Sequence, residues 1–359
     1  MPNTTGTDTR LAELKDWLSA YADQHELDLS TIRSASSDAG FRRYFRIVAG
    51  RVAASFPGSF RIDAAGGTRS YILMDAPPGK EDIRPFIRVD ALCVRAGLNP
   101  PKILAADEKL GFMLLSDLGR YTYLDKFNED RSLAPKYFDA ATTALVSLQS
   151  ISEPGILPDY SEEKIRSELS LFPEWYVKHH RGTALDAKEE KIWNQVCDLL
   201  TASMLAEPKV IVHRDFMPRN LMVSDPMPGI LDFQDALLGP VSYDIASLMR
   251  DAFISWDESF TLDISIRYWE KARKAGIPVP ADFGEFWRQI EWTGMQRHLK
   301  ILGIFARLQY RDNKPKYLAD TPRFIAYVRH VAYRYEQLKP ILVIIDRLEG
   351  PSKSEGWTY

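Results

Sequence analysis

The sequence predicts an α+β protein of two lobes, a small and mostly antiparallel β lobe followed by a larger helical lobe. Short strand-like runs separated by turn residues dominate residues 1–116, whereas apolar residues at helical spacing dominate residues 117–359. The pattern changes at Ser116-Asp117-Leu118-Gly119, which we interpret as the connection between the lobes. A chain of 359 residues is long enough for this organisation.

The expected elements of the first lobe are three strand regions and two helices. A helix is expected over 8–26, a strand-turn-strand over Thr31–Val48, a strand at Tyr71–Met74, a helix over Pro85–Ala96 and a strand pair over Ile103–Leu115. Residues 51–69 are rich in glycine, alanine and serine and are expected to form a loop.

The second lobe is expected to be helical apart from one β segment. Helical spacing covers Tyr121–Ser150, Ser161–Tyr176, Ala187–Ala206 and most of Asp257–Leu348, and the β segment is Val210–Asp235.

Composition narrows the class of protein. A net charge of -3, with 45% apolar and 26% charged residues, is typical of a soluble globular protein and gives no reason to expect a nucleic-acid or membrane partner. Cys93 and Cys197 lack metal-ligand spacing and suit a reducing compartment. The first residues lack an apolar signal core, and no run reaches the roughly 18 apolar residues of a membrane span. We therefore expect a cytoplasmic protein.

The segment Val210–Asp235 carries the strongest motif. An apolar run ends in His213-Arg214-Asp215, Asn220 follows five positions after Asp215, and two short strands around a Pro/Gly turn lead to Asp232-Phe233-Gln234. The hairpin is expected to bring Asp215, Asn220 and Asp232 to one mouth. H-R-D-x-x-x-x-N followed by D-F-x is the phosphoryl-transfer arrangement of the kinases.

The chemistry gives each residue of this motif a role. Asp215 is expected to accept the proton of an attacking hydroxyl, while Asn220 and Asp232 hold a magnesium ion that bridges the ATP phosphates. His213 is expected to support the loop by bonding to backbone rather than to carry protons. The simpler alternative is a hairpin whose Asp and Asn side chains only make turns.

Two further stretches have both a functional and a simpler interpretation. The first-lobe hairpin contains Gly40 and Arg42, Arg43 and Arg46, and it either covers ATP phosphates, with Gly40 and Arg43 as nucleotide contacts, or is an ordinary edge hairpin. If Trp292–Lys316 is one helix, four basic residues form a stripe along it that could bind an acidic substrate or ATP phosphates. The simpler alternative is that the stripe is a solvated face of the helix. The four are Arg297, Lys300, Arg307 and Arg311.

The motif residues, with Gly239-Pro240 and Tyr243-Asp244-Ile245-Ala246 after them, resemble the aminoglycoside phosphotransferase family, a small-molecule kinase branch of the protein-kinase-like fold. The resemblance implies that Asp244 braces the catalytic loop and that Leu115–Leu118, including Asp117, forms the adenine hinge. It also implies ATP, Mg²⁺ and a small-molecule substrate. We expect the chain to be a monomer.

One feature departs from the family pattern, because the first-lobe strand that normally offers a lysine ends in Leu73-Met74-Asp75. Lys80 or an arginine of Phe41–Arg46 could substitute for that lysine, with Asp90 as its partner carboxylate.

Within the family, several stretches resemble the branch that phosphorylates the anomeric hydroxyl of N-acetylmuramate and N-acetylglucosamine in bacterial cell-wall recycling. These stretches are Phe41–Arg46, Met74–Pro78, Leu114–Asp125 and Gln296–Asp312.

This resemblance implies an ATP-dependent sugar 1-kinase of peptidoglycan recycling. Glu168, Trp175 and Tyr176 are candidate sugar contacts or, alternatively, a helix packing face; Arg297 and Arg311 are the candidates from the basic stripe. The alternative functions are an aminoglycoside or other small-alcohol kinase, choline-like or homoserine-like, and a nucleotide-binding pseudokinase.

Overall fold

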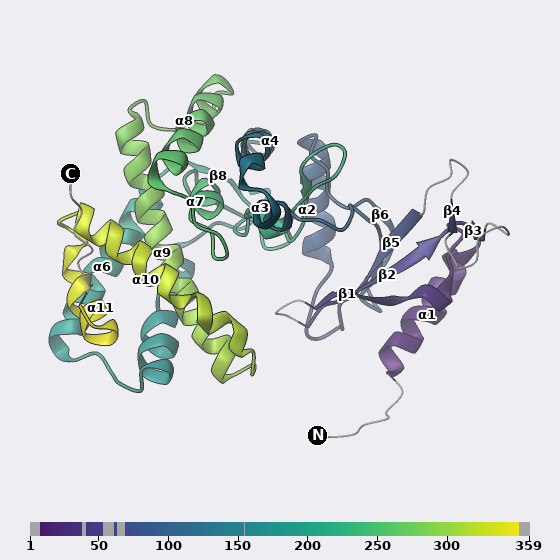
Figure 1. Cartoon of the computed structure of the whole chain (residues 1–359), viewed down its shortest axis with the longest axis horizontal. Coiled ribbons are helices and arrows are strands. Elements are labelled where there is room, and N and C mark those ends of the chain that lie inside the picture. Colours follow the sequence, from purple (N-terminus) through teal and green to yellow (C-terminus); the bar gives the residue numbers. More distant parts are fainter. Residues whose placement is uncertain (1–7, 38–40, 53–60, 63–68, 154, 352–359) are drawn as a thin grey trace.

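The computed structural model describes residues 8–37, 41–52, 61–62, 69–153 and 155–351 (Figure 1). The predicted turn at Asp38–Gly40, and with it Gly40, lies outside the described residues, as does most of the expected loop at 51–69. Within that loop a short antiparallel pair, β3 (Arg51–Val52) and β4 (Arg61–Ile62), is described.

The first lobe is built on a five-stranded antiparallel sheet of order β1-β2-β5-β7-β6. Its strands are β1 (Arg33–Ser37), β2 (Arg43–Ala49), β5 (Arg69–Asp75), β6 (Ile103–Asp107) and β7 (Phe112–Ser116). One face packs against α1 (Thr9–Ala22), whose Leu14 and Leu18 are fully buried against alternate residues of the strands. The other face is turned toward the second lobe. A single turn, η1 (Leu29–Thr31), leads into β1.

Helix α2 (Arg84–Arg95) lies between β5 and β6 in the chain and ends before Gly97, whose φ of +72° is the left-handed conformation that favours glycine. Its Phe86 packs on Phe233 of the D-F-Q motif with ring centroids 4.7 Å apart. This contact places α2 between the two lobes, as Figure 1 shows.

The second lobe is helical. Its helices are α3 (Tyr123–Glu129), α4 (Ala134–Gln149), α5 (Glu162–Leu169), α6 (Ala187–Ala206), α7 (Tyr243–Met249), α8 (Glu258–Lys274), α9 (Phe283–Tyr310), α10 (Thr321–Arg334) and α11 (Leu342–Glu349). The π-helical segment η3 (Phe172–His180) and the 3₁₀ turns η2 (Arg131–Leu133), η4 (Pro218–Asn220), η5 (Pro315–Asp320) and η6 (Lys339–Ile341) complete the described helical elements.

The β structure of this lobe consists of two short antiparallel pairs in the described residues. The predicted hairpin is β9 (Leu221–Met222) with β10 (Gly229–Ile230), and β8 (Lys209–Val212) pairs with β11 (Leu237–Pro240). We did not predict β11, because its Gly-Pro ending resembles a turn. Proline is tolerated there because β11 is an edge strand of a two-stranded sheet.

The structure also corrects two helix boundaries. The expected helix over Tyr121–Ser150 is divided at Asp130, which ends α3 and caps the turn that leads into α4. Helix α9 begins at Phe283 and ends at Tyr310, so Trp292–Lys316 is not one helix. The predicted fold class, a two-lobed α+β chain with an antiparallel sheet and a larger helical part, is confirmed.

Cys93 and Cys197 are buried free thiols. Within the described ranges, none of the helices combines the length and apolar character that crossing a membrane requires.

Candidate active site

A buried carboxylate holds the loop that follows β8. The backbone N–H groups of His213 and Arg214 donate to the two carboxylate oxygens of Asp244 at 2.7 Å and 2.9 Å. Asp244 lies in the first turn of α7 and is fully buried. Hydrogen bonds to a carboxylate are stronger than neutral ones, so the pair fixes the loop just before Asp215. This is the bracing position that the resemblance implies for Asp244.

Backbone and side-chain hydrogen bonds join the other two motif residues to Asp215. The Asn220 amide donates to the carbonyl of Asp215 at 2.8 Å, and the N–H of Leu231 donates to the carbonyl of Asn220 at 2.9 Å. Leu231 directly precedes Asp232, so the hairpin holds all three motif residues at one mouth. Arg214 and Asp232 have φ of +77° and +63°, strained conformations that often occur at functional sites.

His213 is enclosed by the loop and packs edge-on against Phe216 with ring centroids 5.6 Å apart. Burial lowers the pKa of His213, which keeps the imidazole neutral and unsuited to carrying protons at neutral pH. The expected hydrogen bond from its ring to backbone is not made at ordinary length within the described part of the chain. The support that His213 gives to the loop therefore comes from packing and from a weaker interaction with the backbone of Leu231.

Glu168 of α5 lies beneath the catalytic loop. Its carboxylate pairs with Arg214 at 2.6 Å and Lys300 at 3.4 Å, and it accepts hydrogen bonds from the Tyr160 hydroxyl and the Gln296 amide. Burial opposes ionisation, yet the charges of Lys300 and Arg214 lower the pKa of Glu168 to about 2. We therefore correct its predicted role: Glu168 anchors the loop through Arg214 rather than facing a sugar.

Arg297 of α9 lies beside the predicted base. Its side chain is 2% exposed, and Nη2 lies 4.0 Å from Asp215 Oδ1 and 3.5 Å from the carbonyl oxygen of Arg214. The guanidinium also sits over the Tyr243 ring at 5.4 Å. The Asp215 carboxylate is 40% exposed, so it reaches both this buried cation and the open site.

The remaining basic residues of the predicted stripe divide between the interior and the surface. Lys300 is buried, and its ammonium donates to the Tyr243 hydroxyl at 2.7 Å. Arg311 follows the end of α9, is 55% exposed and pairs with Asp312 at 2.8 Å. Both interpretations of the basic stripe are wrong as predicted, because Arg297 and Lys300 are buried in the second lobe, whereas Arg311 is exposed.

Trp175 and Tyr176 lie on η3, which packs against α9. Gly303 of α9 permits this packing, because a Cβ there would lie 2.4 Å from the carbonyl carbon of Leu171. Tyr176 is fully buried, and its hydroxyl donates to Glu349 at 2.8 Å. Its predicted sugar contact is therefore wrong in this structure, and Tyr176 belongs to the packing face. Trp175 is half-buried and stacks on His179.

A cavity of about 350 Å³ lies between the sheet, the inter-lobe linker and the catalytic hairpin. Its lining includes Tyr44, Arg46 and Ile72 from the sheet, Leu115–Gly119 from the linker, and Asn220, Leu231 and Asp232 from the hairpin. Apolar strand residues thus meet polar motif residues across one space, as in small-molecule sites generally. The predicted hinge residues Leu115, Asp117 and Leu118 all line it.

The Asp117 side chain braces the linker. Its carboxylate accepts hydrogen bonds from Arg46 Nε at 2.6 Å, the Ser70 hydroxyl at 2.6 Å and the Gly119 N–H at 3.0 Å. Burial opposes ionisation, but these hydrogen bonds lower the pKa of Asp117. Gly119 has a φ of +113°, and its carbonyl oxygen accepts a hydrogen bond from Arg46 Nη2 at 2.8 Å. Any nucleotide contact by the linker therefore comes from its backbone or from other side chains.

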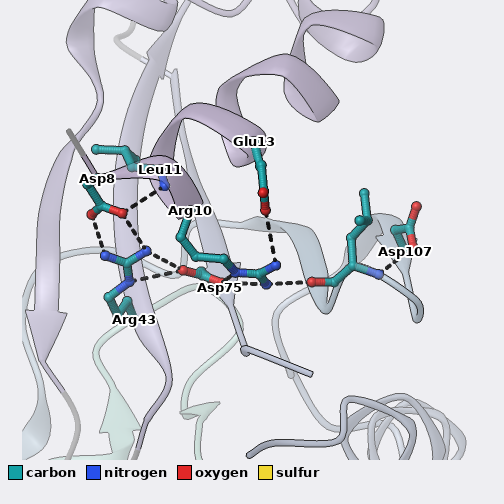
Figure 2. A network of polar contacts seen from close by, with 8 residues as sticks. Asp8, Arg10, Leu11, Glu13, Arg43, Asp75 and Asp107 are labelled. Atoms are coloured by element: carbon teal, nitrogen blue, oxygen red, sulfur yellow. Dashed lines mark hydrogen bonds and ion pairs between the residues drawn. The ribbon is translucent and has the colours of Figure 1, made fainter. Parts of the chain in front are cut away.

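Arg43 is directed away from the cavity. Strand periodicity turns Tyr44 and Arg46 toward the cavity and Arg43 toward α1. Its guanidinium donates to Asp75 Oδ2 at 2.9 Å and 2.6 Å and pairs with Asp8, while Arg10 donates to the other Asp75 oxygen, as Figure 2 shows. The predicted nucleotide contact of Arg43 is therefore wrong in this structure.

Arg42 instead reaches the catalytic motif. Its Nη2 lies 3.8 Å from Asp232 Oδ1, and its Nε lies 3.8 Å from Glu81 Oε2. Lys80, the other candidate for the missing cation, has its ammonium 4.6 Å from the centre of the Phe41 ring.

Asp90, the carboxylate we had expected to pair with this cation, is buried on α2 and forms no ion pair within the described ranges. Burial raises its pKa to about 6. Glu81, which precedes α2, is the carboxylate beside Arg42 instead.

The model of the phosphotransferase enzyme family (APH) matches residues 31–278 of the chain. The chain belongs to this family. The predicted membership is thereby confirmed, and with it the enzyme class, a phosphotransferase.

Relatives of similar length share much of the sequence of this family member. The N-acetylmuramate/N-acetylglucosamine kinase of Neisseria meningitidis serogroup B is 46% identical over 353 residues, which cover 98% of this chain and 99% of that protein. The protein of the same name from Pseudomonas aeruginosa is 46% identical over 338 residues, covering 92% of this chain and 94% of that protein.

The solved structures share the fold at much lower identity. The choline kinase LicA from Streptococcus pneumoniae superimposes with a TM-score of 0.59 at 15% identity, covering 90% of this chain and 99% of that one. At this identity the match supports the two-lobed architecture alone.

Sequence reasoning named Arg42 as one of several candidates for the missing cation, but it did not identify three polar contacts of this phosphotransferase. These are the contact of Arg42 with Asp232, the Arg46–Asp117 pair and the contact of Arg297 with Asp215, and each joins residues far apart in the chain. Arg42 lies one residue before β2, so strand alternation alone gives no signal that separates it from Arg43.

Proposed function

We propose that this phosphotransferase transfers the γ-phosphoryl group of ATP to the anomeric hydroxyl of N-acetylmuramate and N-acetylglucosamine. The observation that carries the phosphoryl-transfer chemistry is the exposed Asp215 carboxylate on a braced loop, joined to Asn220 and Asp232. The acceptor class rests on relatives of that name at 46% identity over nearly the whole chain.

The proposed reaction forms one bond and breaks one. The anomeric oxygen attacks the γ-phosphorus, its proton passes to Asp215, and the bond from the γ-phosphorus to the bridging oxygen of ADP breaks. The braced loop fixes the carboxylate before the substrate arrives, so orientation is set by folding rather than during the reaction. The buried guanidinium of Arg297 places a positive charge near Asp215 and is itself shielded from solvent.

The cavity beside the linker is the proposed nucleotide site. Ile72 and Leu115 offer apolar surface to a base, and the backbone of Ser116–Gly119 offers polar atoms at its edge. Asn220 and Asp232, at the far side of this cavity, would hold Mg²⁺. One amide oxygen and one carboxylate suit this ion, which keeps several waters and phosphate oxygens as ligands. When bound, the ion stabilises negative charge on the phosphates.

The family pattern needs a cation near the phosphates, and we assign Arg42 to this role. It lies within 3.8 Å of Asp232, the proposed metal ligand, and within 3.8 Å of Glu81. A guanidinium can bind phosphate oxygens in a bidentate manner, so it can replace the usual ammonium.

A transfer assay tests the function. The purified chain is incubated with γ-labelled ATP, Mg²⁺ and either sugar, and both labelled product and loss of reducing-end reactivity are measured. Phosphorylation of the anomeric hydroxyl predicts that both signals change together in equal amounts. Label transfer with an intact reducing end would place the phosphate on another hydroxyl. No transfer to either sugar, together with transfer to an aminoglycoside or choline, would refute the proposed acceptor while retaining the enzyme class.

A further inference from the structure

A second cavity, of about 400 Å³, adjoins the proposed nucleotide site at the inter-lobe linker. Four arginines line it: Arg33 from β1, Arg46 from β2, Arg69 from β5 and Arg120 just after the linker. Among the described residues of its lining, Asp117 is the one carboxylate. Arg46, Asp117, Gly119 and Arg120 also line the first cavity, so the two spaces adjoin along the linker, and Arg33 and Arg69 belong to the second cavity alone.

The pairing of β1 with β2 brings two of these arginines together. Arg33 and Arg46 are directly opposite each other in the antiparallel register of β1 and β2. Like charges at facing positions of neighbouring strands destabilise a sheet. A bound anion between them would offset that cost.

Among the residues that the structure describes, the positive charges of the cavity are only partly compensated. Asp117 is engaged with Arg46, and the contact of Arg69 Nη2 with Glu26 is 3.8 Å long and solvent-exposed, so it is weak. Arg33 and Arg120 form no ion pair with any described residue. Since the whole chain carries a net charge of -3, this concentration of arginines is local.

We propose that this second cavity binds a small molecule through a multiply charged phosphate or diphosphate group, separately from the nucleotide. Planar guanidinium groups bind phosphate oxygens in pairs, and arginines from three strands and from the segment after the linker line the space, with Arg46 already engaged in part by Asp117 and Gly119. The cavity volume lies within the range of small-molecule sites. An occupant contacts Arg46, the side chain that also holds Asp117 and Gly119 of the linker.

The site does not depend on which alcohol the enzyme phosphorylates, because none of these arginines belongs to the catalytic motif. Arg33 and Arg69 also lie outside the lining of the nucleotide cavity. Changing either one therefore tests the second cavity alone.

The probe is inorganic pyrophosphate, titrated by calorimetry into the full chain. A saturating non-hydrolysable ATP analogue, with magnesium in excess over all phosphates, occupies the nucleotide site, and ionic strength is held constant with potassium chloride. The variants are Arg33→Gln and Arg69→Gln. The matched control is Arg267→Gln, which removes an exposed arginine of α8 that pairs with Asp263. Circular dichroism and affinity for the ATP analogue check that each variant is folded.

The proposal predicts saturable binding of one pyrophosphate per chain. Each test variant weakens it about tenfold, as expected for loss of a charge-assisted hydrogen bond, while the control stays within about twofold. The titration is then repeated with glucose 1-phosphate. Whichever of the two probes binds more tightly shows whether the cavity prefers a phosphorylated sugar or free diphosphate. Absence of saturable binding for both probes, or an equal loss in Arg267→Gln, would overturn the proposal.

Discussion

The Nη2 atom of Arg297 lies 4.0 Å from Oδ1 of Asp215, and the arginine is buried while the aspartate is half open to solvent. The same guanidinium donates to the carbonyl of Arg214, the residue before Asp215. Helix α9, more than eighty residues further along the chain, therefore fixes the position of the proposed base.

Removing this cation should reduce turnover more than substrate binding. In Arg297→Met the Asp215 carboxylate loses its neighbour and its fixed orientation, so we expect kcat to fall by about tenfold or more with KM for ATP little changed. Arg297→Lys keeps the charge and should recover part of the loss. Steady-state kinetics and thermal unfolding of both variants separate positioning from folding. An unchanged kcat in folded Arg297→Met would contradict the positioning role.

Arg42 should act on the nucleotide instead. Arg42→Gln removes the cation next to Asp232, and we expect KM for ATP to rise about tenfold. Arg84→Gln serves as the control, since Arg84 is 72% exposed and its ion pair within the described residues is with the nearby Asp82. Equal KM values for Arg42→Gln and the wild type would mean that Arg42 is not the cation that binds the ATP phosphates.

Glu168 predicts a specific acid response. A carboxyl whose pKa is lower in the folded chain stabilises the fold above its unfolded value, about 4.3, and this contribution disappears as the pH falls toward about 2. As the pH falls from about 4.3 to about 2, the free energy of unfolding should therefore decrease more steeply for the wild type than for Glu168→Gln. Urea unfolding at several pH values measures the difference, with the exposed Glu163→Gln of the same helix as control. Parallel curves for the wild type and Glu168→Gln would refute the assignment.

Tyr176→Phe should affect stability alone. The substitution removes the hydroxyl that donates to Glu349 and accepts from Arg181, and loss of one such hydrogen bond costs about 1 kcal/mol. Thermal unfolding should show this decrease, while KM for the sugar stays at the wild-type value. The exposed Tyr333→Phe is the matched control. A raised KM at unchanged stability would restore Tyr176 to the substrate site.

The sequence predicted the parts of the site that lie close together in the chain. Asp215, Asn220 and Asp232 lie within one hairpin, so their spacing and the turn between them were enough to bring them together. The antiparallel sheet and the helical lobe followed from residue periodicity in the same way.

Residue periodicity could not decide which face of an element is buried. Arg42 and Arg43 are adjacent, and only pairing of β2 with β5 determines that Arg43 turns to Asp75. Likewise, Glu168 and Tyr176 have helical spacing that suits a substrate face or a packing face equally well. The lobe boundary near Ser116, the monomeric state and a cytoplasmic location stay predictions.

The central claim is that Asp215 accepts the proton during phosphoryl transfer to the sugar. The most direct measurement is the rate of label transfer from ATP to N-acetylglucosamine by Asp215→Asn, compared with Asp225→Asn, which changes an exposed aspartate in the turn of the same hairpin. We predict a loss of about 10²–10⁴-fold for Asp215→Asn, with affinity for an ATP analogue retained, and wild-type rates for Asp225→Asn. Transfer by folded Asp215→Asn at about the wild-type rate would contradict the account.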